Sequence, residues 1–447
     1  MEKDRNDAEN VGDVARSQVP LSHRLGFWTN GCVLAGWVLV LTSFLVGGSV
    51  GALFPLKMAV PIILFGTLSN ALVGMLIAGA SARTGYSSAL LFRFAYGRKG
   101  VIFPIVIMGL TVIGWFSVIL SLTRDGLAQH LGLEAGSVPW LLCTIALGAL
   151  FILPAVLNIR WIAYVDWVAV PAFLIVFGVV LVMTLKSAGG IEPIWNKWYP
   201  PKVSPFIGFD MAAGGWLVGV TIIGDVARFW KSGRQAALGL MIAYGGLVTI
   251  EYWGGAIGAA YTGDYNLFNI ANVLGLGFIA WVALYLGAQS TIQGGVYGAG
   301  LAFSAPPIPL IKNQEYMRKL MTIGVGIAGI VGNFAGIDKV FFWWVQFLTW
   351  IVAPIAITII LDYWAFPSRR LQYEDVEGAD MSVNPAAFVA WVAGFGVGFY
   401  TGMTGAFSAL ITGMATAGIV YYVWMRVAIA RGTTPEIQVF GKRLRAA

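Results

Sequence analysis

Apolar residues fall in long runs along the chain, and short polar stretches separate these runs. A helix needs about 20 apolar residues to cross the roughly 30 Å hydrocarbon core of a bilayer. Helix is the structure that the runs favour, because backbone groups in lipid must satisfy their own hydrogen bonds. We therefore predict an all-α integral membrane protein with twelve transmembrane helices. They are expected near residues 31–54, 58–82, 101–123, 138–158, 162–185, 206–227, 235–261, 272–302, 318–336, 340–362, 386–403 and 405–425.

Composition supports the same class of protein. Of 447 residues, 58% are hydrophobic and 11% are charged, whereas soluble domains carry about 25% charged residues. Cys32 and Cys143 both fall inside apolar runs, which argues against a disulfide framework. The sequence contains no hydrolase, oxidoreductase or phosphate-binding motif in a suitable context. We expect a protein that is not an enzyme, needs no cofactor and is driven by an ion gradient.

The basic residues set the expected orientation. If the N-terminus is cytoplasmic, all but six of the 28 Lys and Arg residues face the cytoplasm, as the positive-inside rule requires. The net charge of +7 is therefore a topology signal and does not indicate a nucleic-acid partner. We predict a multi-pass protein of the cell membrane, without a cleavable signal, whose cytoplasmic tails are residues 1–30 and 426–447. The six residues on the external side would be Lys57, Arg124, Lys186, Lys197, Lys202 and Lys339.

The spacing of the runs predicts an internal repeat. Residues 31–185 and 206–362 each hold five runs, and residues 386–425 hold the last two. An odd number of spans inverts the second block relative to the first, as in transporters whose first and sixth helices are interrupted at the binding site. The first and sixth runs are rich in glycine, which favours either such breaks or close helix packing. These glycines are Gly47, Gly48, Gly51, Gly214, Gly215, Gly219 and Gly224.

Aromatic and polar residues mark a candidate site. Trp115 in the third run and Trp216 in the sixth could stack on both faces of a flat ring. Thr111 lies one turn before Trp115, and residues 289–293 place Gln289, Ser290, Thr291 and Gln293 inside the apolar eighth run. Buried amides and hydroxyls are costly unless they find partners, so the glutamines are candidates to bond the edge of the ring. The alternative for each tryptophan is interfacial anchoring or packing.

Few carboxylates fall inside the runs. Glu251 lies midway along the seventh run and could carry a proton or form a buried hydrogen bond. Asp225 and Arg228 are three residues apart and could pair on one helix face. Asp166 and Asp362 lie near cytoplasmic ends, where capping or pairing is the favoured role. With so little charge at the candidate site, we expect a neutral substrate.

Four motifs give the chain a family resemblance. Their order and spacing resemble the nucleobase:cation symporter-1 family, which includes bacterial cytosine and hydantoin permeases, over essentially the whole chain. The motifs are Arg83-Thr84-Gly85 with Arg93-Phe94-Ala95-Tyr96-Gly97 and Gly100 in the second intracellular loop, Gly114-Trp115-Phe116, Asp225-x-x-Arg228-Phe229, and Asp362-Tyr363.

The resemblance implies a leucine-transporter-like fold of two inverted five-helix repeats plus two helices, which works by alternating access. Trp115 and Trp216 then match the aromatic pair that stacks on the substrate ring, and Gly215 matches a backbone contact to it. In members that use sodium, the ion lies between helices one and eight. Ser290 and Thr291 match its hydroxyl ligands, while Val40, Ser43 and Gly287 match its carbonyl ligands.

The chain departs from the family pattern at the positions that read the ring. Val112 stands where cytosine permease has a glutamine, and Ile292 then Gln293 stand where the family often has asparagine. We expect a Na⁺-coupled importer of a nucleobase or related neutral heterocycle that works as a monomer. One alternative is a proton-coupled transporter of another small neutral nitrogenous solute that uses Glu251. An intramembrane enzyme and a passive channel are remoter alternatives.

Overall fold

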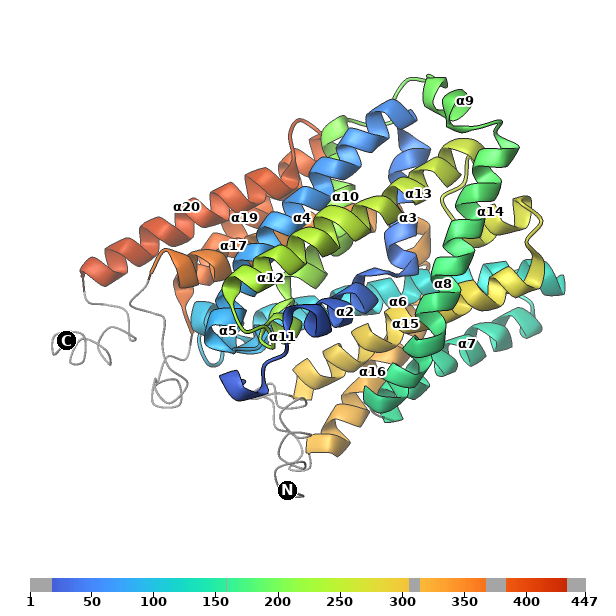
Figure 1. Cartoon of the computed structure of the whole chain (residues 1–447). Coiled ribbons are helices and arrows are strands. Elements are labelled where there is room, and N and C mark those ends of the chain that lie inside the picture. The colour runs from blue at the N-terminus through green and yellow to red at the C-terminus, as the bar shows by residue number, and fades with distance from the viewer. Residues whose placement is uncertain (1–17, 158, 305–313, 367–382, 432–447) are drawn as a thin grey trace.

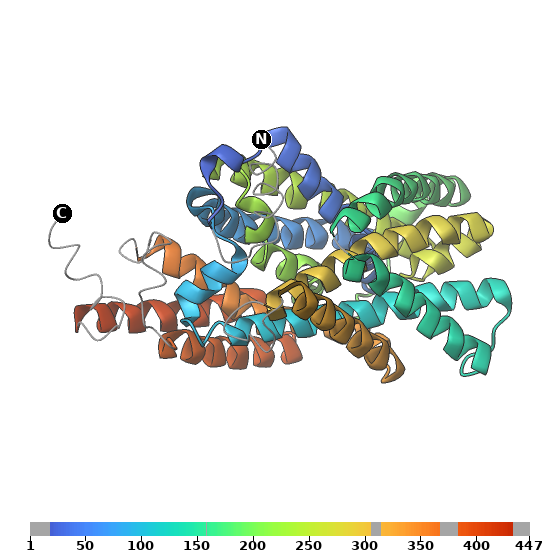
Figure 2. The same cartoon turned by 90° about the horizontal axis from the view of Figure 1, so that it is seen from below.

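In the computed structural model, the chain is a bundle of helices (Figures 1 and 2). The structure describes residues 18–157, 159–304, 314–366 and 383–431. Within these residues the only β-structure is an isolated bridge between Leu25 and Trp230. The helix α20 lies at one flank of the bundle and α7 at the opposite flank in both views. The long helices are α4 (Leu56–Thr84), α6 (Ile102–Leu131), α7 (Val138–Leu157), α8 (Ile159–Ser187), α10 (Pro205–Thr221), α13 (Val248–Thr262), α15 (Gly277–Ser304), α16 (Gln314–Phe334), α17 (Phe341–Trp364), α19 (Pro385–Thr404) and α20 (Ala409–Ala430).

Every apolar run of the sequence coincides with one helix or with two or three consecutive helices. Among the described residues, eight helices are long and apolar enough to cross a membrane, and a bent pair makes nine. The helices α10, α15 and α16 lie on three other expected runs. The fold is therefore a multi-helix membrane bundle, and the count of twelve spans stays a prediction. The shorter elements are η1 (Leu21–His23), α5 (Ser88–Tyr96), α9 (Ile191–Asn196), α11 (Gly224–Ala227), α12 (Gly233–Leu240), η2 (Met241–Leu247), α14 (Leu267–Val273) and η3 (Ile337–Val340).

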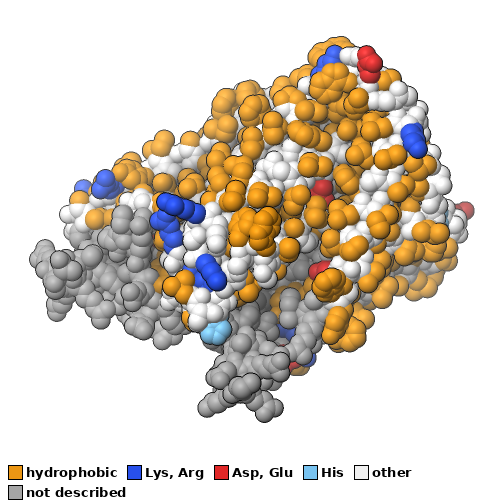
Figure 3. Space-filling model, viewed as in Figure 1, with side chains coloured by type: hydrophobic (Ala, Val, Ile, Leu, Met, Phe, Trp, Pro, Cys, Tyr) orange, Lys and Arg blue, Asp and Glu red, His pale blue; other side chains and the backbone are white. Residues whose placement is uncertain are grey.

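The outer surface is apolar over a broad band (Figure 3). Large hydrophobic side chains such as Trp167, Ile175 and Ile279 are more than half exposed. Lys and Arg side chains gather mostly toward the two ends of the face that Figure 3 shows. An exposed apolar band between charged ends is the surface expected of a protein that is solvated by lipid.

The first expected span is broken. Its two parts, α2 (Phe27–Val38) and α3 (Leu41–Leu53), are bent by 53° at Leu39 and Val40. Val40 is extended (φ −146°, ψ 156°), and no side chain caps the start of α3. A break of this kind frees backbone groups for a ligand, as in transporters with discontinuous helices. The glycines of this span indicated either a break or close helix packing, and the break precedes them and does not include them.

The glycines of α3 serve helix packing. A Cβ on Gly47 would lie 2.1 Å from the carbonyl oxygen of Tyr252, and one on Gly51 would lie 2.5 Å from the Cα of Ala256. From the other side, a Cβ on Gly255 would lie 2.1 Å from the carbonyl oxygen of Phe44. The backbones of α3 and α13 therefore touch directly, the close approach that small residues permit in membranes.

Three carboxylates hold helices together, and two of them, Asp210 and Asp362, are buried. Asp210 of α10 caps the start of α20, where it accepts bonds from the Ser408 hydroxyl (2.6 Å) and the backbone of Ala409 (2.7 Å). Asp225 accepts a bond from the backbone N–H of Ser88 (3.0 Å) at the start of α5. A carboxylate at a helix N-terminus offsets the positive end of the helix dipole. Asp362 of α17 instead accepts a 2.6 Å bond from the hydroxyl of Tyr421. The acids at these three positions thus have structural partners.

Candidate functional site

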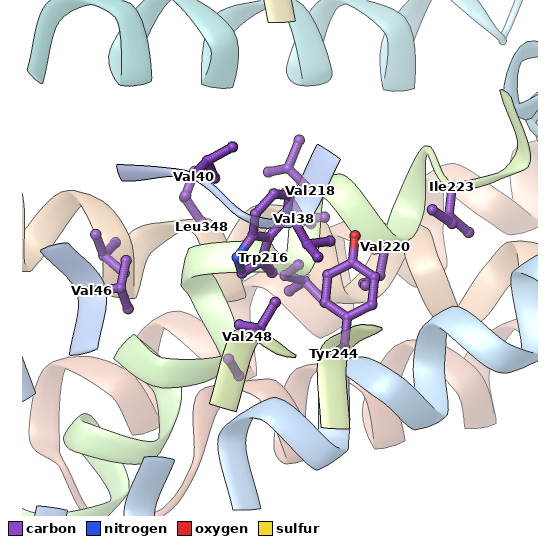
Figure 4. Packing of buried hydrophobic residues seen from close by; sticks show 14 of the residues in the cluster. Val38, Val40, Val46, Trp216, Val218, Val220, Ile223, Tyr244, Val248 and Leu348 are labelled. Atoms are coloured by element: carbon purple, nitrogen blue, oxygen red, sulfur yellow. The ribbon is translucent and has the colours of Figure 1, made fainter. Parts of the chain in front are cut away.

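The break between α2 and α3 lies beside Trp216 of α10 (Figure 4). The indole Nε1 of Trp216 donates a 2.9 Å hydrogen bond to the hydroxyl of Ser43, in the first turn of α3. The indole ring meets the ring of Tyr244 edge to face, with the centroids 5.5 Å apart. Only 7% of Trp216 is exposed. This tryptophan therefore joins the broken helix to α10 and to the π-helical η2.

Trp115 lies on α6 and is partly exposed. Its ring makes an edge contact with Phe341 of α17, at a centroid distance of 6.0 Å. The hydroxyl of Thr111 donates to the carbonyl of Met108 in the same helix (2.6 Å). In this structure Trp115 and Trp216 contact different aromatic partners, and Thr111 is fully buried.

The polar residues of α15 form a directed chain of hydrogen bonds. The Tyr285 hydroxyl donates to Oε1 of Gln289 (2.9 Å), whose Nε2 donates to the carbonyl of Phe151 (3.2 Å) and to Oε1 of Gln293 (3.4 Å). Nε2 of Gln293 donates to Oδ1 of Asp166 on α8 (2.7 Å). Both glutamines are buried. They therefore face α7 and α8 and already have partners before any ligand binds.

The predicted ion ligands come from α3 and α15, and these two helices are in contact. The hydroxyl of Thr291 donates to the carbonyl of Gly287 one turn earlier (3.0 Å). Ser290 lies beside the carboxylate of Asp166. Val40 and Ser43 are buried at the start of α3. The structure thus places one group of candidate ligands at a helix break and the other on an intact helix.

Beyond Thr291, one face of α15 is open. Gly294 and Gly298 are exposed, and a Cβ on either would meet no atom within 4 Å. The same holds for Gly31 and Gly36 of α2. Space is therefore free beside the half of α15 that follows the hydroxyls and along the part of α2 that precedes the break.

Glu251 lies on α13, next to the break between α2 and α3. It is 1% exposed, and neither carboxylate oxygen has a hydrogen-bond partner among the described residues. The Ser43 side chain and the backbone N–H of Val40 lie beside the carboxylate, without completing such a bond. The hydroxyls of Tyr244 and Tyr252 also lack partners within the described chain. A Cβ on Gly215 would lie 2.3 Å from the Tyr252 hydroxyl, so this hydroxyl points at the predicted backbone contact.

Reasoning from the sequence missed two of these positions, Tyr244 and Tyr252, and gave Asp166 a capping or pairing role without naming its partner. Tyr244 and Tyr252 sit in an apolar run with many aromatic residues, and no local pattern distinguishes them. Asp166 carried a usable signal, because the polar group of the eighth run needed partners on a neighbouring helix. A carboxylate inside the fifth run was an available partner.

Comparison with known proteins identifies the family. The family model of permeases for cytosine/purines, uracil, thiamine and allantoin matches residues 18–425. The chain belongs to this permease family. The permease is 25% identical over 395 residues to the cytosine permease of Escherichia coli strain K12, which covers 87% of this chain and 89% of the relative. The cytosine permease of Escherichia coli O157:H7 matches to the same extent.

Solved structures agree on the fold of the permease. The inward-facing conformation of Mhp1 matches with a TM-score of 0.78 at 17% identity, covering 93% of this chain and 94% of Mhp1. Mhp1, described as a nucleobase-cation-symport-1 family transporter, matches in a closed conformation with bromovinylhydantoin bound at a TM-score of 0.72 and 18% identity, covering 93% and 96%. A Na⁺-coupled sialic acid symporter matches at a TM-score of 0.61 and 14% identity, covering 90% and 89%. The permease is a multi-span membrane transporter, not an enzyme.

Proposed function

We propose that the permease imports a nucleobase or a related neutral heterocycle together with Na⁺, by alternating access. The observation that carries this proposal is the 2.9 Å bond between Trp216 and Ser43. It links a tryptophan suited to stack on a ring with the broken helix whose freed backbone suits a cation. Ion binding at the break and ring binding at Trp216 would then stabilise the same arrangement of α3 and α10. Coupling of this kind is reciprocal, so Na⁺ should raise substrate affinity.

In the proposed site, Trp115 and Trp216 clamp the ring and the backbone of Gly215 contacts it. Gln289 or Gln293 bonds the edge of the ring, after giving up one of the bonds that it makes within the bundle. A hard cation is held by the hydroxyls of Ser290 and Thr291 and by the carbonyl oxygens of Val40, Ser43 and Gly287. Neutral oxygen ligands of this kind can replace the water shell of an alkali ion.

We further propose twelve spans, arranged as two inverted repeats and a final pair. The protein would be a monomer in the cytoplasmic membrane of the cell, with both termini in the cytoplasm. In that topology the open glycine face of α15 leads toward the cytoplasm. The higher TM-score against the inward-facing Mhp1 structure than against the closed one supports an inward-open arrangement.

Uptake into proteoliposomes tests the proposal. Radiolabelled cytosine, uracil, hypoxanthine, a hydantoin and allantoin would be offered with an inward Na⁺ gradient, an inward proton gradient or neither. Accumulation of one of these rings on the Na⁺ gradient is expected. Failure of every ring to accumulate would overturn the substrate class.

Proton coupling through Glu251 is the second candidate function. Glu251 favours it, because this fully buried carboxylate lies next to the broken helix and has no hydrogen-bond partner among the described residues. Under this alternative, Glu251→Gln abolishes uptake driven by a pH gradient. Under Na⁺ coupling, the same variant keeps its Na⁺-driven uptake.

A further inference from the structure

Asp166 is partly exposed and differs from the other carboxylates of the bundle in its surroundings. It lies within the apolar part of α8, Tyr164–Ser187, and faces α15. Asp210 and Asp225 lie at helix N-termini, and Asp225 also interacts with Arg228. Asp166 caps no helix that the structure describes; its partners are the side chains of Gln293 and Ser290.

No positive charge compensates Asp166 among the described side chains. Ion pairs among them, such as Arg124 with Asp125 and Lys319 with Glu315, lie elsewhere. A carboxylate in the hydrocarbon region is costly unless it is paired, and such acids commonly mark ion pathways. The amide of Gln293 supplies one hydrogen bond but no charge. The hydrogen bond from Gln293 therefore holds the Asp166 carboxylate in place, and no described side chain supplies the positive charge that would neutralise it.

The hydrogen-bond chain of α15 fixes this carboxylate. From Tyr285 through Gln289 and Gln293, each group donates toward the next, and the chain ends on Oδ1 of Asp166. Such a chain orients the acid as an acceptor and holds its rotamer. Carboxylate and hydroxyl oxygens are the ligands that hard cations prefer. Ser290, already a candidate ion ligand, presents its hydroxyl beside the same acid.

We propose that the carboxylate of Asp166 is a further direct ligand of the transported cation, which it reaches from α8 beside the hydroxyl of Ser290. This inference rests on the proposed Na⁺-coupled function and deepens it. The cation site then carries one negative charge, so that Na⁺ enters a site that its own charge neutralises. The amides of Gln289 and Gln293 position the acid and do not bind the ion.

The rival role for Asp166 is purely structural. As an acceptor for Gln293, it could do no more than fasten α8 to α15. Both roles predict a loss of stability when the carboxylate is changed. Only the ligand role predicts a change in the concentration of Na⁺ that half-saturates the protein.

The experiment measures the thermal midpoint of the purified full chain, without transported solute, as NaCl replaces choline chloride at constant ionic strength. A bound ion raises the midpoint of the wild type in a saturable way. In Asp166→Asn we expect half-saturation to need at least about tenfold more Na⁺, because the charge of the ligand set controls cation affinity. Asp166→Ser, which keeps a small oxygen ligand, is the second variant if the first is not monodisperse. Asp362→Asn is the matched control, because its Oδ1 can still accept the bond from Tyr421.

The outcomes separate the two proposals. A lower midpoint in choline with wild-type half-saturation in both Asp166 variants would overturn the ligand role and leave Na⁺ coupling intact. No response of the wild type to Na⁺ would overturn Na⁺ coupling itself, and the ligand role with it. Loss of the response in Asp166 variants, with a normal response in Asp362→Asn, would support the inference.

Discussion

Two helix interfaces of the permease place an acid inside the membrane bundle, and they are built in opposite ways. Between α3 and α13, glycines bring the backbones into direct contact, and Glu251 has no hydrogen bond within the described chain. Between α8 and α15, amide side chains span the gap, and Asp166 is the end of their hydrogen-bond chain.

This difference in construction determines how each interface can respond when a ligand or an ion binds. Backbone contact leaves no room for adjustment, so α3 and α13 are expected to move as one body. Side-chain hydrogen bonds can be exchanged for bonds to a ligand or an ion at modest net cost. The α8–α15 interface is therefore the better suited of the two to respond to an ion.

The largest expected effect is in the glycine interface. Gly47→Leu places a side chain where a Cβ alone would be 2.1 Å from the Tyr252 carbonyl. We expect a loss of about 3 kcal/mol or more in stability, because the backbones must separate. The measurement is the yield of monodisperse protein and its thermal midpoint. Gly246→Ala, where a Cβ meets no atom within 4 Å, is the control and should behave as wild type. Equal behaviour of the two variants would contradict direct backbone packing.

The next effect tests the amide interface. Gln289→Leu leaves the carbonyl of Phe151, the hydroxyl of Tyr285 and the Oε1 of Gln293 without their partner. Each buried group left unsatisfied costs about 1–3 kcal/mol, so we expect a total loss of about 2 kcal/mol after relaxation. Chemical or thermal unfolding in detergent measures it. A neutral result would show that water or another side chain already serves these groups.

A smaller effect is expected at the link between ring site and broken helix. Trp216→Phe keeps an aromatic ring but removes the donor to Ser43. One lost neutral hydrogen bond costs about 1 kcal/mol. We expect the Na⁺ dependence of substrate binding, measured by calorimetry at several Na⁺ concentrations, to weaken more than binding at saturating Na⁺. Equal weakening at every Na⁺ concentration would reduce Trp216 to a stacking surface.

The smallest effect on stability is expected at Glu251. Because neither oxygen makes a hydrogen bond with the residues that the structure describes, Glu251→Gln breaks none among them. We expect the thermal midpoint to change by the equivalent of less than about 1 kcal/mol, because the amide keeps the size of the carboxylate and an acceptor oxygen beside Ser43 and Val40. A loss of stability several times larger would show that the carboxylate stabilises the uncapped start of α3. Glu251 and Asp166 would then both serve as hydrogen-bonded acids.

The sequence predicted the fold more completely than it predicted the site. The twelve apolar runs all coincide with helices, because hydrophobicity over 20 residues is a local property. The glycines of the first span indicated either a break or close packing, and the break falls before them, at Leu39 and Val40. Glycine indicates both close packing and unwinding, and only the facing surface of α13 decides between them. The Gln289 and Gln293 amides were expected at a ring edge, yet their partners lie on α7 and α8.

The sequence by itself determined that this is a polytopic helical membrane transporter of a recognisable family, since span length, charge bias and motif order are written along one dimension. Only the tertiary structure decided which acid has which partner. Asp166 and Gln293 are 127 residues apart along the chain, and their side chains meet at 2.7 Å. Glu251 lies close to Ser43 without a completed hydrogen bond. Such pairings depend on how helices rotate and pack against one another, and no local pattern specifies that rotation in a chain whose helices are apolar on most sides.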